Sequence, residues 1–346
     1  MCKMPNIFLV CVSDFYYKNR IFDLNSPVNR DNYYFPYYLL QQEFLKSNIS
    51  LNTYDYFNEN CDENYSLIFF DIPKNVDVLL KYHKNVDKFL VIFESEAVSF
   101  VNWDRNLHGE FKKIFTWNDE LVDNERYIKF HWPNEIPENL ELDLDKKTKL
   151  CTMIIGHKFV SHPLELYSER VKAIRWFEQN HPEDFDLYGM GWDKHYFKGA
   201  LSILNSFDVL RKLIKPGYPS YKGTVKSKRE ILRKYKFSIC YENMRDIPGY
   251  ITEKIFDCFF AGCVPVYWGA PNVTEHIPRS TFIDRRDFAS YDELYSCLKN
   301  MPDERYVEYL DAIKSFIESD RIYSFSAQCF ADTLINEIRG DLTSEH

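Results

Sequence analysis

Short apolar runs alternate with longer amphipathic stretches along most of the chain. Nine runs have the length and the β-branched or aromatic content of buried strands. They are Asn6–Val12, Leu67–Ile72, Phe89–Phe93, Ile114–Trp117, Leu150–Ile155, Phe185–Gly189, Phe237–Tyr241, Val264–Trp268 and Thr281–Ile283. Helical spacing of apolar residues falls between them, at Phe35–Lys46, Leu164–Asn180, Lys226–Lys234, Thr252–Ala261 and Tyr291–Lys299. Strands that alternate with helices predict an α/β fold with parallel sheets covered on both faces.

One polar segment divides this pattern in two. Pro133–Lys149 (PNEIPENLELDLDKKTK) is rich in charge, contains two prolines and has no clear apolar face. A chain of 346 residues is also longer than a single hydrophobic core usually accommodates. We therefore expect domains at 1–132 and 150–325, a linker at 133–149 and a C-terminal helix or tail at 326–346. Two such domains would leave a cleft between the carboxyl ends of their strands, where ligands of α/β proteins bind.

The segment Tyr241–Pro271 combines a polar turn, the start of a helix and a buried strand. Its sequence is YENMRDIPGYITEKIFDCFFAGCVPVYWGAP, in which Thr252 is a suitable N-cap and Lys254 lies in the first helical turn. A helix N-terminus presents free N–H groups and partial positive charge, so the region suits an anion such as a nucleotide phosphate. An ordinary capped helix, with Glu253 complementing the dipole and Lys254 in solvent, fits the same residues.

The composition restricts the classes of function. A hydrophobic content of 45% is typical of a globular protein, and a net charge of −9 argues against general binding of nucleic acid. The aromatic share of 17% can fill cores and also supply stacking surfaces for sugars. The nine cysteines form no CxxC pair, so we expect reduced thiols rather than a disulfide or zinc framework. The N-terminal MCKMPNIFLVCVSD indicates a first strand, not a signal peptide or a membrane span.

The segment YKFSICYEN…GYITEKIFDCFFAGCVPVYWGAP resembles the donor-binding signature of glycosyltransferase family 10, the α-1,3/1,4-fucosyltransferases. The resemblance extends from about Lys222 to Phe288 and continues more weakly over Leu150–Trp192. In the first half it is confined to a short segment near Glu94. It implies a fold of the GT-B type, in which two Rossmann-like domains with parallel sheets face a central cleft. It also implies GDP-β-L-fucose as the donor substrate.

The resemblance places the donor site in this signature. Tyr250, Glu253 and Lys254 belong to the Y-(I/V)-T-E-K element that contacts the nucleotide sugar, with Thr252 between them. Glu253 would suit ribose or fucose hydroxyls, and Lys254 would neutralise the diphosphate. Asn243, in YEN where the family commonly shows FEN, is a further candidate for donor binding.

A second cation for the diphosphate is expected on an amphipathic helix. Arg170 lies in YSERVKAIRWFEQN, and the family has an arginine at the start of the corresponding helix that contacts the donor phosphates. A planar guanidinium can bind two phosphate oxygens at once, which an ammonium group cannot do. Arg175 is an alternative, and a solvated position on the helix would also explain either arginine.

Glu94 is the expected general base. It ends the apolar run KFLVIFES, so it should emerge at the carboxyl end of a strand and face the cleft. The family carries a glutamate in a similar F-E-S-P element, assigned as the base that deprotonates the acceptor hydroxyl. This chain has Glu96 where proline is usual, and Glu96 therefore stays an alternative carboxylate. A glutamate that is merely the first exposed residue after a strand is the other interpretation.

Acceptor-binding residues are expected in NWDRNLHGEFKKIFTWND. Trp103, His108 and Trp117 offer aromatic faces and polar edges there, although most aromatics at this density fill cores. Asp143–Asp145 imitates a D-x-D metal motif but lies in the charged linker, and the histidines lack the spacing of metal ligands. We therefore expect no metal site and no required cofactor, with at most stimulation by a divalent ion.

These features and the resemblance together predict an inverting α-1,3-fucosyltransferase. It would move L-fucose from GDP-β-L-fucose to a hydroxyl of an N-acetylglucosamine-containing surface glycan, so its partners are a nucleotide sugar and a glycan, not nucleic acid. Two alternatives stay open: another GDP-deoxyhexose as donor, or a non-catalytic nucleotide- or carbohydrate-binding protein. With no transmembrane segment predicted, we expect a cytoplasmic location, and peripheral contact with the inner membrane face stays open.

Overall fold

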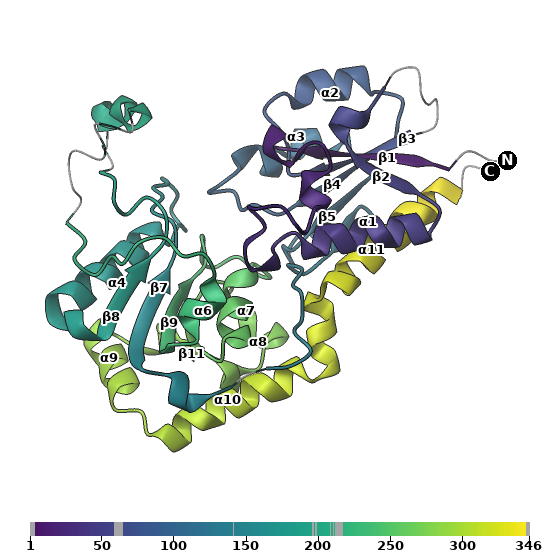
Figure 1. The fold of residues 1–346 in the computed structure, drawn as a ribbon. Coiled ribbons are helices and arrows are strands. Elements are labelled where there is room, and N and C mark those ends of the chain that lie inside the picture. The colour runs from purple at the N-terminus through teal and green to yellow at the C-terminus, as the bar shows by residue number, and fades with distance from the viewer. Residues whose placement is uncertain are drawn as a thin grey trace.

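The computed structural model describes residues 4–58, 65–140, 142–195, 197, 199–207, 209, 211 and 217–343. Two lobes, each built around a parallel sheet, make up the molecule (Figure 1). We refer to them as the N-terminal and C-terminal domains. Glu141 of the expected linker and residues 344–346 of the expected tail lie outside the described residues. The two-sheet α/β fold predicted from the alternation of strands and helices is confirmed.

The N-terminal domain contains a six-stranded sheet in the order β2-β1-β3-β4-β5-β6, and all its pairings are parallel. The strands β1, β3 and β4 are predominantly apolar, because strands of a doubly covered sheet are buried on both faces. The strands are β1 (Asn6–Cys11), β2 (Ser50–Thr53), β3 (Tyr65–Phe70), β4 (Lys88–Ile92), β5 (Lys113–Thr116) and β6 (Tyr127–Lys129).

Helices from both ends of the chain cover this sheet. One face packs against α1 (Phe35–Lys46) and α11 (Ala327–Thr343), whose apolar side chains share one core cluster with the strands. The other face packs against α2 (Val76–Tyr82) and the short α3 (Arg105–His108). Figure 1 shows α11, in yellow, lying beside α1 and away from the domain that precedes it in sequence. The last helix of the chain therefore completes the N-terminal domain.

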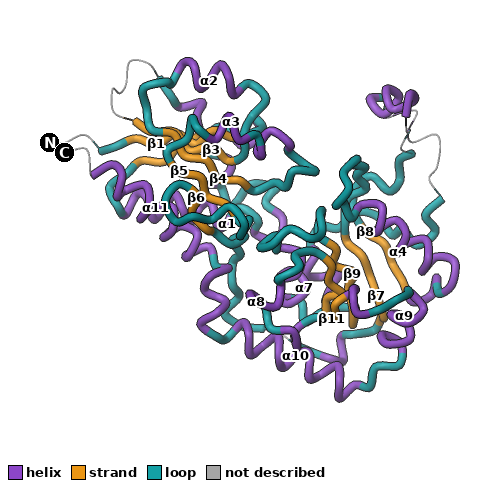
Figure 2. Tube along the Cα trace, turned by 180° about the vertical axis from the view of Figure 1, so that it is seen from behind, coloured by secondary structure: helices purple, strands orange, loops and turns teal. Residues whose placement is uncertain are grey.

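The C-terminal domain contains a five-stranded parallel sheet in the order β11-β10-β9-β7-β8. Its strands are β7 (Lys149–Ile154), β8 (Phe185–Tyr188), β9 (Tyr235–Tyr241), β10 (Val264–Trp268) and β11 (Ile283–Asp284). Its helices are α4 (Tyr167–Asn180), α6 (Lys228–Leu232), α7 (Glu253–Phe260), α8 (Val273–His276), α9 (Tyr291–Lys299) and α10 (Asp303–Ile317). The tube in Figure 2, seen from behind, shows these helices around the orange strands.

The strand order reverses once in each sheet. The chain passes from β1 outward to β2 and then returns to the opposite side of β1 as β3. In the second sheet it passes from β7 to β8 and returns to the opposite side of β7 as β9. In open α/β sheets the crevice at the carboxyl ends of the two strands beside such a reversal is the usual ligand site. The fold therefore indicates a ligand site at the carboxyl ends of β7 and β9.

A few elements differ from the expectation. The edge strands β2 and β6 were not predicted, and the expected strand Thr281–Ile283 begins only at Ile283, because Arg279–Thr281 forms a 3-10 turn. Within the described residues, seven cysteines are free thiols, in line with the prediction of reduced cysteines. The same part of the chain holds no helix with the length and apolar character needed to cross a bilayer.

Candidate active site

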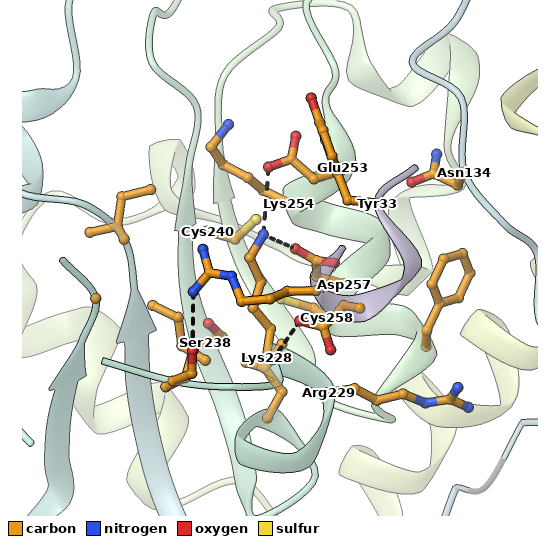
Figure 3. Close-up of a pocket in the computed structure, with 18 of the residues that line it drawn as sticks. Tyr33, Asn134, Lys228, Arg229, Ser238, Cys240, Glu253, Lys254, Asp257 and Cys258 are labelled. Atoms are coloured by element: carbon orange, nitrogen blue, oxygen red, sulfur yellow. Dashed lines mark hydrogen bonds and ion pairs between the residues drawn. The ribbon is translucent and has the colours of Figure 1, made fainter. Parts of the chain in front are cut away.

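A cavity of about 770 Å³ opens at the carboxyl ends of β7 and β9. In the C-terminal domain its wall includes residues 153–156 at the end of β7 and residues 238–241 at the end of β9. Residues between 28 and 37 of the N-terminal domain form another wall. The cavity thus lies at the reversal of strand order and between the two domains, and Figure 3 shows part of its lining.

The first turn of α7 faces this cavity, and both Glu253 and Lys254 line it. The body of α7 is held in the core by its apolar side chains, so the polar start of the helix has a fixed position. Thr252 occupies the N-cap position, as expected, but its side chain does not cap the helix. Its N–H and its hydroxyl donate instead to the two carboxylate oxygens of Glu242, each at 2.8 Å.

Glu242 is a fully buried carboxylate that anchors Lys254. Lys254 Nζ lies 2.9 Å from Glu242 Oε2 and 2.8 Å from Thr252 Oγ1. Burial alone would lower the pKa of Lys254, but the charges of Glu242 and Glu253 outweigh burial and raise it. The ammonium group is therefore charged and fixed at the edge of the cavity.

Arg170 on α4 is a second cation in the cavity wall. Its side chain is only 2% exposed, and Nη2 donates to the Tyr241 carbonyl at 2.8 Å and to Asn243 Oδ1 at 3.0 Å. Its Nε has no hydrogen-bond partner among the described residues. Burial lowers the pKa of Arg170, yet a guanidinium stays protonated in proteins. Arg170 therefore adds a fixed positive charge to the wall of the cavity, which suits an anion.

Lys228 adds a third cation that the sequence analysis missed. Figure 3 shows its side chain between those of Glu253 and Asp257. Lys228 Nζ lies 2.6 Å from Asp257 Oδ2 and 3.7 Å from Glu253 Oε1. Burial would raise the pKa of Glu253, but Lys254 and Lys228 lower it to about 2. The carboxylate of Glu253 is therefore ionised and accepts hydrogen bonds.

Glu94 projects from the N-terminal domain two residues beyond β4. It is half-buried, and its carboxylate interacts electrostatically with Lys158 and Lys254 of the C-terminal domain. Burial raises the pKa of Glu94, and the two lysines only partly oppose that effect. The charge of Lys254 in the C-terminal domain thus acts on the Glu94 carboxylate, although Glu94 itself is not among the residues that line the cavity.

Other expected donor-site residues lie outside the wall of the cavity. Tyr250 is 1% exposed and packs its ring on Trp117 of the N-terminal domain, with ring centroids 4.4 Å apart. Asn243 orients Arg170 through its side-chain oxygen. In this structure Tyr250 therefore lies at the contact between the two domains. Asn243 accepts a hydrogen bond from Arg170, and Thr252 accepts one from Lys254.

The three expected acceptor residues have different surroundings. Trp103 lines a second, smaller cavity of about 220 Å³ together with Glu96, Asn118 and Glu120. His108 is 1% exposed, with its ring nitrogens 2.8 Å from the Asn102 carbonyl and 3.0 Å from the Tyr127 hydroxyl. Trp117 is also buried. His108 and Trp117 thus present no free surface to an acceptor in this structure, because both complete the core beneath the cleft.

No group of three or more histidine, cysteine, aspartate or glutamate side chains is arranged to hold a metal ion in the described part of the chain. Asp143 of the D-x-D sequence accepts a hydrogen bond from the Asp145 N–H at 3.0 Å, as the cap of a 3-10 turn.

Two doubly wound domains that enclose a cleft of this kind define the GT-B class of glycosyltransferases. Residues 144–331 match the model of glycosyltransferase family 10 (fucosyltransferase), C-terminal part. The match covers more than half of the chain, and the protein belongs to this family.

The chain is similar to the α-(1,3)-fucosyltransferase FucT of Helicobacter pylori, with 38% identity over 291 residues, or 80% of this chain. It spans 55% of the length of that relative. Two crystal structures of an α1,3-fucosyltransferase share the fold. One has a TM-score of 0.55 at 17% identity and covers 96% of this chain and 90% of its own. The other, with GDP-fucose, has a TM-score of 0.51 at 19% identity and covers 92% and 93%.

Proposed function

We propose that this protein is an inverting α-1,3-fucosyltransferase. It transfers L-fucose from GDP-β-L-fucose to a hydroxyl of an N-acetylglucosamine-containing glycan. The observation that carries the proposal is the convergence of Arg170 and Lys254 on one cavity, with the carboxylate of Glu94 close enough to Lys254 for the two charges to interact. Family membership and the name of the Helicobacter pylori relative support fucose as the sugar and α-1,3 as the linkage.

The cavity suits a nucleoside diphosphate. Its volume of about 770 Å³ lies in the range of small-molecule sites, and its wall combines apolar residues with three fixed cations, Arg170, Lys228 and Lys254. The Arg170 guanidinium and the Lys254 ammonium would bind the phosphate oxygens. Glu253, held ionised by its lysine neighbours, would accept hydrogen bonds from sugar hydroxyls.

The chemistry is a single displacement at the anomeric carbon. Glu94 takes the proton of the acceptor hydroxyl while that oxygen forms a bond to the anomeric carbon, on the face opposite GDP. The bond from the anomeric carbon to the phosphate oxygen breaks, and GDP departs with the electron pair. Burial raises the pKa of Glu94 toward neutral pH. A carboxylate with such a pKa accepts a proton more readily than an exposed glutamate does, and it is therefore better suited to this proton transfer.

The cations stabilise the charge that develops on the departing phosphate. Because Arg170 and Lys254 are held in place before the substrate arrives, little reorganisation is needed in the transition state. Groups preorganised in this way can each contribute about 3–4 kcal/mol to lowering the barrier. No step of this scheme requires a metal ion.

The test is acceptor-dependent release of GDP. The protein is incubated with GDP-fucose and an array of small acceptors, and products are identified by mass and linkage analysis. GDP-mannose, and GDP-deoxyhexoses other than GDP-fucose, serve as competing donors. A product whose mass increases by one fucosyl unit supports the proposal. Products only from another donor, or GDP binding without any acceptor-dependent turnover, would contradict it.

The base assignment is tested with Glu94→Gln. Turnover should fall about 10²–10⁴-fold, since general-base assistance is lost, while the affinity for GDP stays the same. Glu96→Gln is the matched control, since Glu96 lies two residues further along and lines the smaller cavity. Normal turnover of Glu94→Gln, or a larger loss of turnover in Glu96→Gln, would show that another carboxylate is the base.

A further inference from the structure

The backbone of Phe93 and Glu94 is held entirely by side chains. Both residues lie beyond the last paired residue of β4, Ile92, so strand neighbours no longer satisfy their peptide groups. Asp71 Oδ1 accepts the N–H of Phe93 at 2.8 Å and that of Glu94 at 3.1 Å. Trp117 Nε1 donates to the Phe93 carbonyl at 3.0 Å, and Trp103 Nε1 donates to the Glu94 carbonyl at 3.2 Å.

Asp71 is itself rigidly placed. It follows β3 at φ 58°, a left-handed conformation that non-glycine residues adopt only where the surroundings hold it. Its side chain is buried, and Oδ1 accepts a third hydrogen bond from Asn102 Nδ2 at 2.6 Å. Asn102 is fully buried, and its Oδ1 accepts the N–H of Ile72 at 2.7 Å. Both polar atoms of its amide group are therefore hydrogen-bonded, which fixes the orientation of the side chain that supports Asp71.

The two tryptophans connect this support to the other domain. The rings of Trp103 and Trp117 lie 5.2 Å apart, and Trp117 packs on Tyr250 of the loop before α7. That loop also carries Thr252 and leads into Lys254. The side chains that hold Glu94 are thus in direct contact with the loop that positions the cations.

We propose that Asp71, Trp103 and Trp117 are positioning residues that fix Glu94 opposite the donor cavity. Asp71 additionally places a second carboxylate beside the base. The proposal rests on the proposed function, in which Glu94 is the base. All four peptide groups around the base are bound by side chains, and three of the four bonds join residues more than twenty positions apart in the sequence.

Asp71 and Glu94 influence each other electrostatically. Burial and the charge of Glu94 raise the pKa of Asp71 to about 7, although three hydrogen bonds act in the opposite direction. The other titratable groups that interact with Glu94 come from several elements. They are Tyr16 and Tyr33 of the N-terminal domain, and Lys158, Tyr167, Tyr250, Glu253 and Lys254 of the C-terminal domain.

The decisive variant is Asp71→Asn. The amide oxygen can still accept the two N–H groups, but the negative charge beside Glu94 is lost. We expect the kcat profile to lose the step that ionisation of Asp71 adds near pH 7, with kcat above that pH reduced about tenfold and the Kd for GDP unchanged. Asp186→Asn is the control, because Asp186 is a buried carboxylate of the other sheet that binds Lys149 and Tyr235. It should reduce thermal stability without removing that step.

Trp103→Phe and Trp117→Phe test the other two bonds. Phenylalanine keeps an aromatic ring in place but cannot donate to the carbonyl, so each variant should lower kcat about tenfold at constant Kd for GDP. Trp176→Phe is the control. Trp176 lies on α4 and stacks on Tyr291, and its loss should leave kcat unchanged.

A measurement without substrate separates this inference from the proposed function. The carboxyl pKa of Glu94 is followed by NMR in ¹³C-glutamate-labelled protein, with Glu94→Gln to assign the signal. In the wild type the Glu94 signal should show a second step near pH 7, when Asp71 ionises beside it, and Asp71→Asn should remove that step even if no acceptor is turned over. A step that persists in Asp71→Asn overturns the role of Asp71. Normal kcat in both tryptophan variants, or a parallel loss of GDP affinity, overturns the positioning role. An inactive wild type would refute only the proposed function.

Discussion

Arg170 is a cation that the fold has removed from water before any ligand arrives. Removing a charge from water is costly unless hydrogen bonds compensate, and here a carbonyl and an amide oxygen satisfy only Nη2. Binding an anion beside this guanidinium requires little further desolvation, because the side chain is already buried. Arg170 therefore contributes to phosphate binding through its burial as well as through its charge.

Arg170→Lys should weaken GDP binding about 10- to 100-fold. One ammonium group cannot reach Tyr241, Asn243 and a phosphate together, and a charge-assisted hydrogen bond contributes about 1.5–3 kcal/mol. Isothermal titration calorimetry measures the Kd. Arg175→Lys is the control on the same helix, where Arg175 pairs with Glu178 and lies over the ring of Tyr218. Equal losses in the two variants would refute the special role of Arg170.

The sequence identified some residues of the site and not others, for a physical reason. Glu253, Lys254 and Arg170 were predicted, and the structure brings them to one cavity. Glu242 and Lys228 were missed. Glu242 precedes Asn243 in YEN, but nothing in three letters reveals that its carboxylate is completely buried. Lys228 lies in a charged helix start, SKREI, that looks like solvated surface until Asp257 of α7 packs against it.

Gly249 shows how one element limits the approach of the two domains. Its φ is 79°, and an added Cβ would lie 2.2 Å from the Trp117 carbonyl oxygen. The loop between β9 and α7 can therefore contact the N-terminal domain only where a side chain is missing. This close approach places Tyr250 against Trp117.

Gly249→Ala should lower the free energy of unfolding by about 2–5 kcal/mol. The left-handed backbone costs an alanine about 1–2 kcal/mol, and overpacking against the carbonyl adds about 1–3 kcal/mol. Urea denaturation measures the change. Gly223→Ala is the matched control, since Gly223 also has positive φ, 108°, but an added Cβ meets nothing within 4 Å. If both variants lose the same free energy, the collision with Trp117 is unimportant.

At the level of elements, sequence patterns were informative in the centre of each sheet and weak at its edges. The predicted strands Phe89–Phe93 and Val264–Trp268 correspond closely to β4 and β10, because a buried strand needs an unbroken apolar run. The strands β2 (SLNT) and β6 (YIK) are short and partly polar, and each pairs on one side only. Their conformation depends on a neighbouring strand, which local sequence does not specify.

For the whole molecule, Asp31 links the two domains at the mouth of the cavity. It accepts the hydroxyl of Ser227 at 2.5 Å and the N–H of Lys228 at 2.8 Å, and Arg30 Nη1 donates to the Val225 carbonyl at 3.2 Å. All of these contacts cross from the N-terminal to the C-terminal domain. They hold one wall of the cavity against the other.

Asp31→Ala should loosen this contact. We expect a larger radius of gyration in small-angle scattering and a three- to tenfold weaker GDP affinity, corresponding to about 1 kcal/mol of lost hydrogen bonding. Asp23→Ala is the control in the same region, because Asp23 accepts a hydrogen bond from Asn25 N–H within its own domain. An unchanged radius and an unchanged Kd would show that the contact does not determine domain closure.

His131 makes the junction of the domains sensitive to acid. Its ring lies 5.2 Å from that of His276 and 4.6 Å from that of Phe325. Burial, together with Lys129 and His276, lowers the pKa of His131 to about 3. Because the unfolded chain protonates this histidine near pH 6.5, the neutral form stabilises the fold above that pH, and this contribution is lost as the pH falls toward 3.

His131→Phe should reduce the loss of stability in acid. The free energy of unfolding of the wild type should fall by up to about 1.4 kcal/mol more per pH unit than that of the variant between pH 6 and 4. Chemical denaturation at a series of pH values measures the difference. His181→Phe, at a ring stacked on Tyr295, is the control. Parallel pH profiles for wild type and His131→Phe would contradict the assignment.

The return of α11 to the N-terminal domain has a consequence for synthesis on the ribosome. Phe330, Ala331, Leu334, Ile335 and Ile338 belong to the same core as the strands β1, β3 and β4. The N-terminal domain is synthesised before the C-terminal domain, yet its core is complete only afterwards. Nascent chains that have already folded the C-terminal domain should still expose the binding face of α1 to chaperones, until α11 emerges and covers it.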